Sequence, residues 1–179
     1  QAGIRHVLGS RGLGDVYKIQ LCGLDYHWPV PKDAQLAMFE AHLELANKHD
    51  MPVLVHDREA HADTYALLAQ YRPKGIVHCF SGSAPDAVRL AEQGMYIGFG
   101  GVLTFANARK TVEAAAALPL ERIVLETDCP YMAPVPFRGK RCDSGMIVHV
   151  AQKLSEIHAK PVEEILSVTE QNARTLFRV

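Results

Sequence analysis

Residues 120–131 read LERIVLETDCPY, and this stretch indicates how the chain folds. An apolar run of the strand type ends in two carboxylates, and a proline-rich loop follows. Two earlier apolar runs have the same form and end at His56 and His78. Because the carboxyl ends of parallel strands open on one face of a sheet, we expect these histidines to lie near Asp128. Two imidazoles and a carboxylate are typical metal ligands, so the sequence predicts a metal site at this face.

The rest of the chain repeats the pattern of a strand followed by a helix. Strands are predicted at 16–22, 52–55, 75–79, 95–99 and 122–127. Helices are predicted after a cap at Asp33, at about 59–71, from Pro85 to Gly94, and at about 108–118, 144–158 and 161–177. Such alternation predicts an α/β fold with about five parallel strands in one domain over residues 1–179. An eight-unit α/β barrel typically needs about 250 residues, so 179 residues are short for a complete one.

Composition excludes several classes of protein. The net charge is -1, so a polyanion would need a local basic patch rather than a basic surface. The four cysteines form no CxxC pair, which favours a reduced, cytoplasmic protein in which Cys79 and Cys129 pack as buried thiols. No apolar run reaches the roughly 18 residues that span a bilayer, and no signal-peptide pattern opens the chain. We therefore expect no membrane contact.

Polar side chains near the predicted site could bind phosphate. The candidates are Arg58, Ser81, Arg138 and Lys140. An arginine guanidinium matches phosphate with two parallel hydrogen bonds, and Tyr131 and Phe137 in the same loop could stack on bases. The competing interpretation is an ordinary solvated loop. Histidines within helices, such as His61, are expected on solvated faces rather than at the site.

The motifs, taken in order, resemble those of the TatD family. They are GLDY (23–26), VLVHDREA (53–60), GIVHCFSG (75–82), IGFGG (97–101), LETDCPY (125–131), FRGK (137–140) and NARTLF (172–177). The resemblance implies a TIM-barrel-like fold of the metal-dependent hydrolase superfamily and an activity that is often that of a deoxyribonuclease. It also implies two divalent metal ions (Mg, Mn or Zn), with His56 and His78 as ligands of one. Asp128 would bind the other and act as the catalytic residue that orients the attacking water.

Two departures from the family pattern stand at the start of the chain. The family's first strand carries a His-x-His pair, whereas His6 has no partner two residues away. Leu21 takes the place of the family's metal-bridging glutamate. The chain thus resembles the last five βα units of an eight-unit barrel, with an atypical segment at 1–21 and a site for one metal ion or none. Open sheet edges would favour self-association.

Three functions remain open at this point. The first is hydrolysis of DNA phosphodiester bonds, in single strands or at 3' or 5' ends, by metal-activated water. The second is a catalytically impaired relative that keeps the fold and weak metal binding. The third is hydrolysis of an amide or ester, since a metal-bound hydroxide also attacks carbonyl groups.

Overall fold

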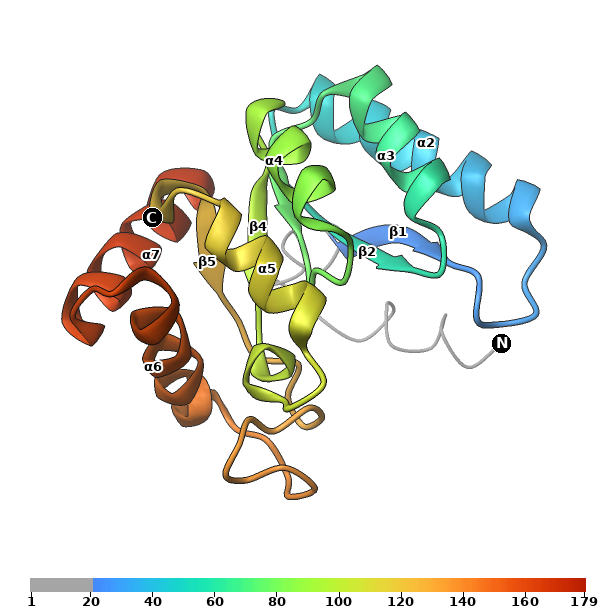
Figure 1. The fold of residues 1–179 in the computed structure, drawn as a ribbon. Coiled ribbons are helices and arrows are strands. Elements are labelled where there is room, and N and C mark those ends of the chain that lie inside the picture. The colour runs from blue at the N-terminus through green and yellow to red at the C-terminus, as the bar shows by residue number, and fades with distance from the viewer. Residues whose placement is uncertain (1–20) are drawn as a thin grey trace, which may run out of the picture.

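The computed structural model describes residues 21–179, which form one parallel sheet covered by helices (Figure 1). The strands are β1 (Leu21–Asp25), β2 (Val53–Arg58), β3 (Gly75–Val77), β4 (Tyr96–Phe99) and β5 (Ile123–Leu125). The α-helices are α2 (Lys32–Lys48), α3 (His61–Tyr71), α4 (Ala84–Glu92), α5 (Arg109–Ala117), α6 (Ile147–His158) and α7 (Val162–Phe177). Short 3-10 helices lie at η2 (Gly101–Thr104), η3 (Leu120–Arg122) and η4 (Ser144–Met146). The prediction of an α/β fold with five parallel strands is confirmed.

The sheet has the order β1-β2-β3-β4-β5, so each strand pairs with its successor in the chain. All five carboxyl ends therefore lie at the same edge, where β5 continues into the long loop 126–143 (Figure 1). Side chains alternate between the two faces of each strand. One set, including Val55, Val77 and Ile97, is buried against the helices in the main core.

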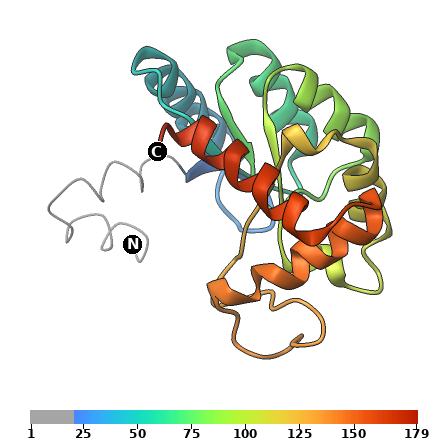
Figure 2. The same ribbon diagram turned by 90° about the vertical axis from the view of Figure 1, so that its left-hand side faces the viewer.

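The other face of the sheet carries a smaller cluster. Ile76 and Val124 are buried there against Leu176 of α7. Figure 2 shows α7 passing across the sheet on this side. Asn172 of α7 is buried and its Nδ2 donates to the carbonyl oxygens of Leu120 and Ile123, at 2.7 and 2.8 Å. These two bonds attach α7 to the start of β5.

The helix that follows β3 is fixed at its start by local hydrogen bonds. Ser83 caps α4: its Oγ accepts from the Asp86 backbone N–H, and the Asp86 carboxylate accepts from the Ser83 N–H. This capping box, together with Pro85 in the first turn, satisfies donors that a helix start leaves open. Pro85 lies where the sequence predicts it. The cap also limits the length of the loop that carries His78 and Ser81.

Several predicted boundaries are wrong in detail. The loop expected at 23–26 is largely strand, because β1 pairs with β2 as far as Asp25. The strands β3 and β5 end two residues earlier than predicted, at Val77 and Leu125. Asp33 does not cap α2, which begins after Pro31, although its charge in the first turn still favours the helix dipole.

Two further predictions concern residues 1–20 and contact with a membrane. Expectations for residues 1–20, including the lone His6 and the start of the first predicted strand, lie outside the described residues. Among residues 21–179, no helix combines the length and apolar composition needed to cross a bilayer.

Candidate metal centre

The sheet register brings the two predicted histidine ligands onto neighbouring strands. Val55 of β2 pairs with Val77 of β3, and the backbone N–H of His78 donates to the Val55 carbonyl at 2.9 Å. His56 and His78 each follow that pair by one residue, so they stand side by side at the carboxyl edge. The convergence expected from the sequence thus holds for the backbone of these two strands.

His78 is held between two carboxylates. Its Nδ1 lies 2.7 Å from Oε2 of Glu126, and its Nε2 lies 3.6 Å from Oδ1 of Asp128. An ionised carboxylate only accepts hydrogen bonds, so Nδ1 carries the proton in the neutral ring. The lone pair of Nε2 is then free on the side of Asp128. Histidines that bind metals are oriented in this way by a second carboxylate.

The Glu126 carboxylate is itself fixed by the backbone. Its Oε1 accepts from the Cys79 N–H at 2.5 Å, while Oε2 is bonded to His78. Gly98 leaves the space, since a Cβ there would lie 2.8–3.0 Å from the carboxylate atoms of Glu126. Any larger residue at position 98 would push the carboxylate away from His78.

The surroundings of His78 also set its charge. Burial lowers the pKa of His78, but the hydrogen bond to Glu126 and the charges of Glu126 and Asp128 outweigh burial and leave the pKa above its usual value. Two nearby carboxylates make this a site that favours a cation. A proton and a metal ion would therefore compete for Nε2.

His56 has a different partner. Its Nε2 lies 3.0 Å from Oδ2 of Asp25, at the end of β1. The other oxygen of Asp25 accepts from the His27 backbone N–H at 3.1 Å, and Gln35 of α2 bonds to the Asp25 backbone. Asp25 is thus fixed at the edge of the site, and it orients the His56 ring.

The donor set fits a divalent metal ion in part. Two ligand atoms that each lie about 2.1 Å from a zinc ion at the tetrahedral angle are about 3.4 Å apart. The 3.6 Å between Nε2 of His78 and Oδ1 of Asp128 is close to this value and too long for a good hydrogen bond. However, residues 21–179 contain no group of three His, Cys, Asp or Glu side chains that could hold a metal ion. Leu21 contributes only an exposed apolar side chain.

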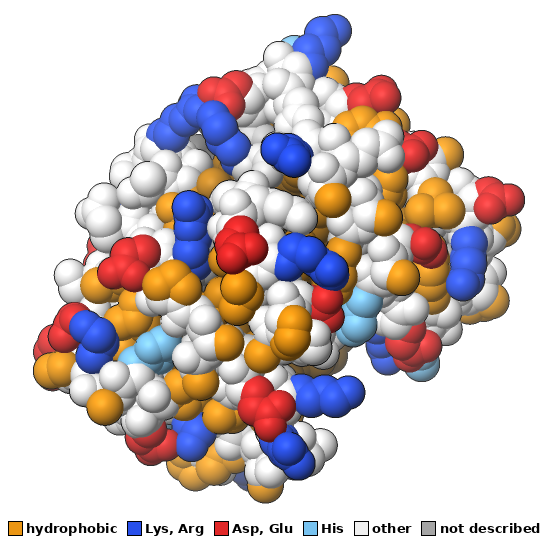
Figure 3. Space-filling view, turned by 45° about the horizontal axis from the view of Figure 1, so that its top comes forward, with side chains coloured by type: hydrophobic (Ala, Val, Ile, Leu, Met, Phe, Trp, Pro, Cys, Tyr) orange, Lys and Arg blue, Asp and Glu red, His pale blue; other side chains and the backbone are white. Residues whose placement is uncertain are grey.

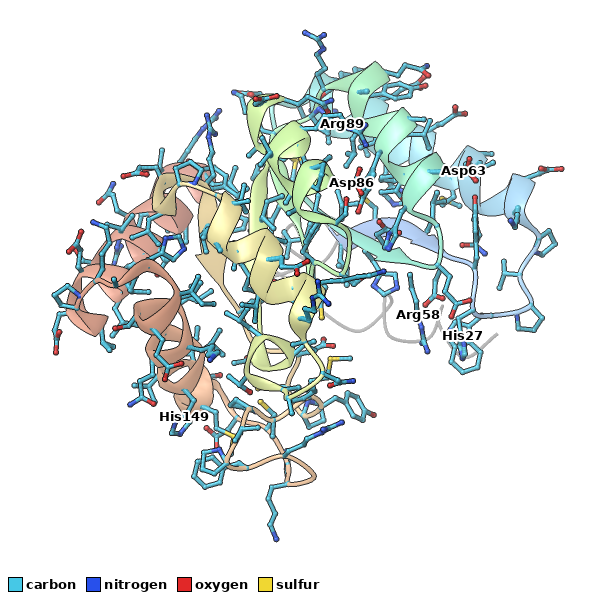
Figure 4. All side chains as sticks on the ribbon, viewed as in Figure 1. His27, Arg58, Asp63, Asp86, Arg89 and His149 are labelled. Atoms are coloured by element: carbon cyan, nitrogen blue, oxygen red, sulfur yellow. The ribbon has the colours of Figure 1, made fainter. Side chains whose placement is uncertain are left out.

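The four candidate phosphate ligands are all exposed: Arg58 ends β2, and the other three lie in the loops that follow β3 and β5. Arg58 is the last residue of β2, and Figure 4 shows it near His27. Arg138 lies over the ring of Phe105, with Cζ 4.4 Å from the centroid. Phe137 packs beside His149 of α6, whereas Tyr131 is 71% exposed. The structure therefore leaves Arg58, Ser81, Arg138 and Lys140 available to a ligand, and shows no direct contact between them and His78.

The face of the molecule drawn in Figure 3 has no dominant charge. Figure 3 shows basic and acidic side chains interspersed over one face of the molecule, as the net charge of -1 leads one to expect. A net charge near zero gives no overall attraction for a polyanion, so a local basic patch would be needed.

Three expectations about single residues need correction. Cys129 was expected to be buried, but it is exposed, because β5 ends before it reaches that residue. Cys79 is half-buried and contacts the sulfur of Met132; burial, with the charges of Glu126 and Asp128, raises its pKa to about 12. His61 is not simply solvated, since its Nδ1 lies 2.6 Å from Oδ2 of Asp57.

Sequence reasoning missed what Asp57 does, and for Glu126 it predicts a structural or supporting carboxylate without naming His78 as the partner. Asp57 lies in β2 with a side chain that is only 3% exposed, and its Oδ2 contacts His61 at the start of α3. The signal for Glu126 was its position two residues before Asp128, which puts both on the same face of an extended chain.

The family relationship follows from a direct comparison. Residues 13–178 match the family model "TatD related DNase". The chain belongs to the TatD family. The metal-dependent hydrolase YabD of Bacillus subtilis, itself described as uncharacterized, is 40% identical over 161 residues, which cover 88% of this chain and 63% of the relative. The 3'-5' ssDNA/RNA exonuclease TatD of Pantoea vagans is 33% identical, with 92% of this chain and 67% of that protein covered.

The solved structures agree with the fold. YJJV, a TatD homologue from Escherichia coli K12, superposes with a TM-score of 0.82 at 34% identity, covering 88% of this chain and 62% of that one. The chain spans a little under two thirds of the length of the first relatives it matches. The predicted resemblance and the barrel-like α/β fold are both confirmed.

Proposed function

We propose that the protein is a metal-dependent phosphodiesterase that acts on single-stranded DNA or on DNA ends. The observation that carries the proposal is the arrangement around His78, in which Glu126 holds Nδ1 and Asp128 faces Nε2. The exonuclease name of the Pantoea relative supports the substrate class. Membership of a family of metal-dependent hydrolases supports the need for a metal.

Each residue has a distinct part in the proposed reaction. His78 Nε2 and Asp128 would hold a divalent cation, with His56 beside them on the next strand. When bound, such an ion lowers the pKa of a water molecule and polarises the phosphoryl group. The second oxygen of Asp128, Oδ2, would accept the proton of the attacking water, while Oδ1 faces His78. Glu126 keeps His78 in the tautomer that leaves Nε2 free.

The loop that follows β5 would bind the nucleic acid. Arg138 and Lys140 are exposed there and would contact phosphates, while the exposed ring of Tyr131 would stack on a base. The same basic residues favour a phosphodiester over an amide or ester substrate, because they would complement the charge of the phosphate.

The test is nucleotide release from a single-stranded oligonucleotide with Mg²⁺, Mn²⁺ or Zn²⁺, followed over time. His78→Ala should abolish release, whereas the matched variant His49→Ala should retain it, because His49 follows α2 and precedes β2, at the end of that strand opposite the site. Release that is unchanged in His78→Ala would refute the proposed centre. Hydrolysis of a cyclic amide in preference to the oligonucleotide would refute the substrate class.

A second function is favoured by one specific observation. Among the described residues, no group of three His, Cys, Asp or Glu side chains is placed to hold a metal ion. Leu21 also stands where the resemblance to the family implies a glutamate that bridges two metal ions. The alternative is therefore a chain that binds one metal ion weakly without turnover. Calorimetry together with the release assay would separate the two functions. The alternative predicts metal binding that requires His78, but no nucleotide release with any of the three ions.

A further inference from the structure

Two of the four cysteines come together at the ends of the loop that follows the candidate site. Cys129 follows Asp128 directly and is exposed, and Cys142 closes the same loop. The backbone N–H of Cys142 donates to the carbonyl of Pro130 at 3.0 Å, so the two ends of the loop lie side by side. Cys129 and Cys142 also line one open surface depression, together with Pro130, Arg141, Asp143 and Ser144.

The two thiols are near enough to interact. Burial raises the pKa of the Cys142 thiol, and the neighbouring Cys129 thiol raises this pKa further. Neither sulfur is bonded covalently, since both cysteines are free. Cys129 Sγ lies 3.1 Å from the hydroxyl of Thr127, and Cys142 Sγ lies 3.7 Å from the Asp143 carbonyl. Sulfur is a weak donor and acceptor, so neither contact holds its side chain firmly.

We propose that Cys129 and Cys142 form an oxidative modification site, at which a peroxide converts the two thiols into an intramolecular disulfide. The exposed Cys129 is the thiol that a peroxide reaches first. Its sulfur attacks one peroxide oxygen, the O–O bond breaks and hydroxide leaves, which gives a sulfenic acid and, after protonation, water. The sulfur of Cys142 then attacks the Cys129 sulfur, the S–O bond breaks, and the departing hydroxide takes the Cys142 proton. The two thiols lose two electrons and two protons in total, and the peroxide is reduced to two water molecules.

The other two cysteines are poorly placed for this chemistry. Cys22 is buried in the core beside α2, and burial raises its pKa to about 12. Cys79 is half-buried against Met132 and has carboxylates as neighbours, which also disfavour its thiolate. The exposed Cys129, with a second thiol beside it, is the arrangement typical of a cysteine that is oxidised reversibly.

The disulfide would close a ring around the loop that carries Tyr131, Arg138 and Lys140. It would also pull Cys129 away from Thr127, and Asp128 is attached directly to Cys129. Oxidation would therefore shift Asp128 in the candidate site through its neighbour Cys129. Formation of the disulfide itself does not rest on the proposed function.

The test is disulfide mapping on the full chain. The reduced protein is treated with hydrogen peroxide, free thiols are blocked, and the peptides are analysed by mass spectrometry without reduction. The expected result is a cross-link between the peptides of Cys129 and Cys142, a fall from four free thiols to two per chain, and full recovery with dithiothreitol.

Matched variants make the outcome decisive. Cys142→Ser and Cys129→Ser should each abolish the cross-link, and Cys129→Ser changes an exposed residue, so its fold should survive even where that of Cys142→Ser does not. Cys22→Ala should retain the cross-link. Oxidation of Cys129 only to sulfinic acid, cross-links between chains, or a cross-link that survives in Cys129→Ser would each overturn the proposal. Loss of nuclease activity without any cross-link would do so as well, because the modification would then lie elsewhere.

Discussion

Replacing Glu126 by Gln tests whether the carboxylate behind His78 prepares it for a metal ion. The carboxylate accepts two hydrogen bonds, from His78 Nδ1 and from the Cys79 N–H. A glutamine amide has one oxygen, so it can accept only one of them and must present an N–H group to the other donor. Loss of a carboxylate that orients a metal-binding histidine typically costs about 10–100-fold in metal affinity, or about 1.4–2.7 kcal/mol.

The assay is calorimetric titration of the full chain with Zn²⁺ or Mn²⁺, with urea unfolding to confirm that the variant is folded. Glu92→Gln, at an exposed helix end, is the matched control and should bind as the unmodified protein does. In Glu126→Gln the pKa of His78, measured by NMR, should fall, because burial still lowers it while the main opposing interaction is gone. Gly98→Ala should weaken metal binding in the same direction by displacing the carboxylate. Metal affinity within twofold of the control in both variants would refute the reasoning.

Three further predictions concern stability and nucleic-acid binding. Asn172→Ala leaves two buried carbonyl groups without their donor and should lower the free energy of unfolding by about 2–4 kcal/mol in urea, whereas the exposed Gln171→Ala should change it little. Hydrogen bonds to Lys74 and then Arg178 lower the pKa of Asp50 from 3.8 to about 2, so its contribution to stability is present above pH 3.8 and is lost as the pH falls towards 2. Asp50→Asn should therefore be less stable than the unmodified protein at pH 7, and equal stability losses in the two proteins between pH 4 and 2 would contradict this. Replacing Arg138 and Lys140 together by Ala should weaken binding to single-stranded DNA and flatten the plot of log affinity against log salt by about 1.4, and an unchanged slope would show that neither contacts a phosphate.

The sequence could predict the positions of the site residues better than their partners. His78 and Asp128 were found because each follows an apolar run, and parallel strands bring such ends together. The contact between Cys79 and Glu126 could not be predicted, because it joins residues 47 positions apart through a backbone turn with a positive φ of 46° at Cys79. The pairing of His56 with Asp25 was missed for a related reason, since the sequence placed Asp25 in a loop rather than at the end of β1.

Strand boundaries were the other source of error. Hydrophobic runs show where a strand lies. The end of a strand is set by where its backbone hydrogen bonds to the neighbouring strand stop, and this depends on residues distant in sequence. The exposure of Cys129 follows from such an ending, because β5 ends at Leu125. Residue type and local spacing could therefore locate the candidate site without giving the hydrogen bonds that orient it.

The order of the sheet bears on how the chain folds during synthesis. Each strand pairs with the next one in the sequence, so every pairing between described strands can form as soon as its second strand has left the ribosome. The contact between Arg178 and Asp50 differs, because it joins residues 128 positions apart. A growing chain can thus assemble its sheet step by step, but α7 can be secured against the start of β2 only when translation of these residues is complete.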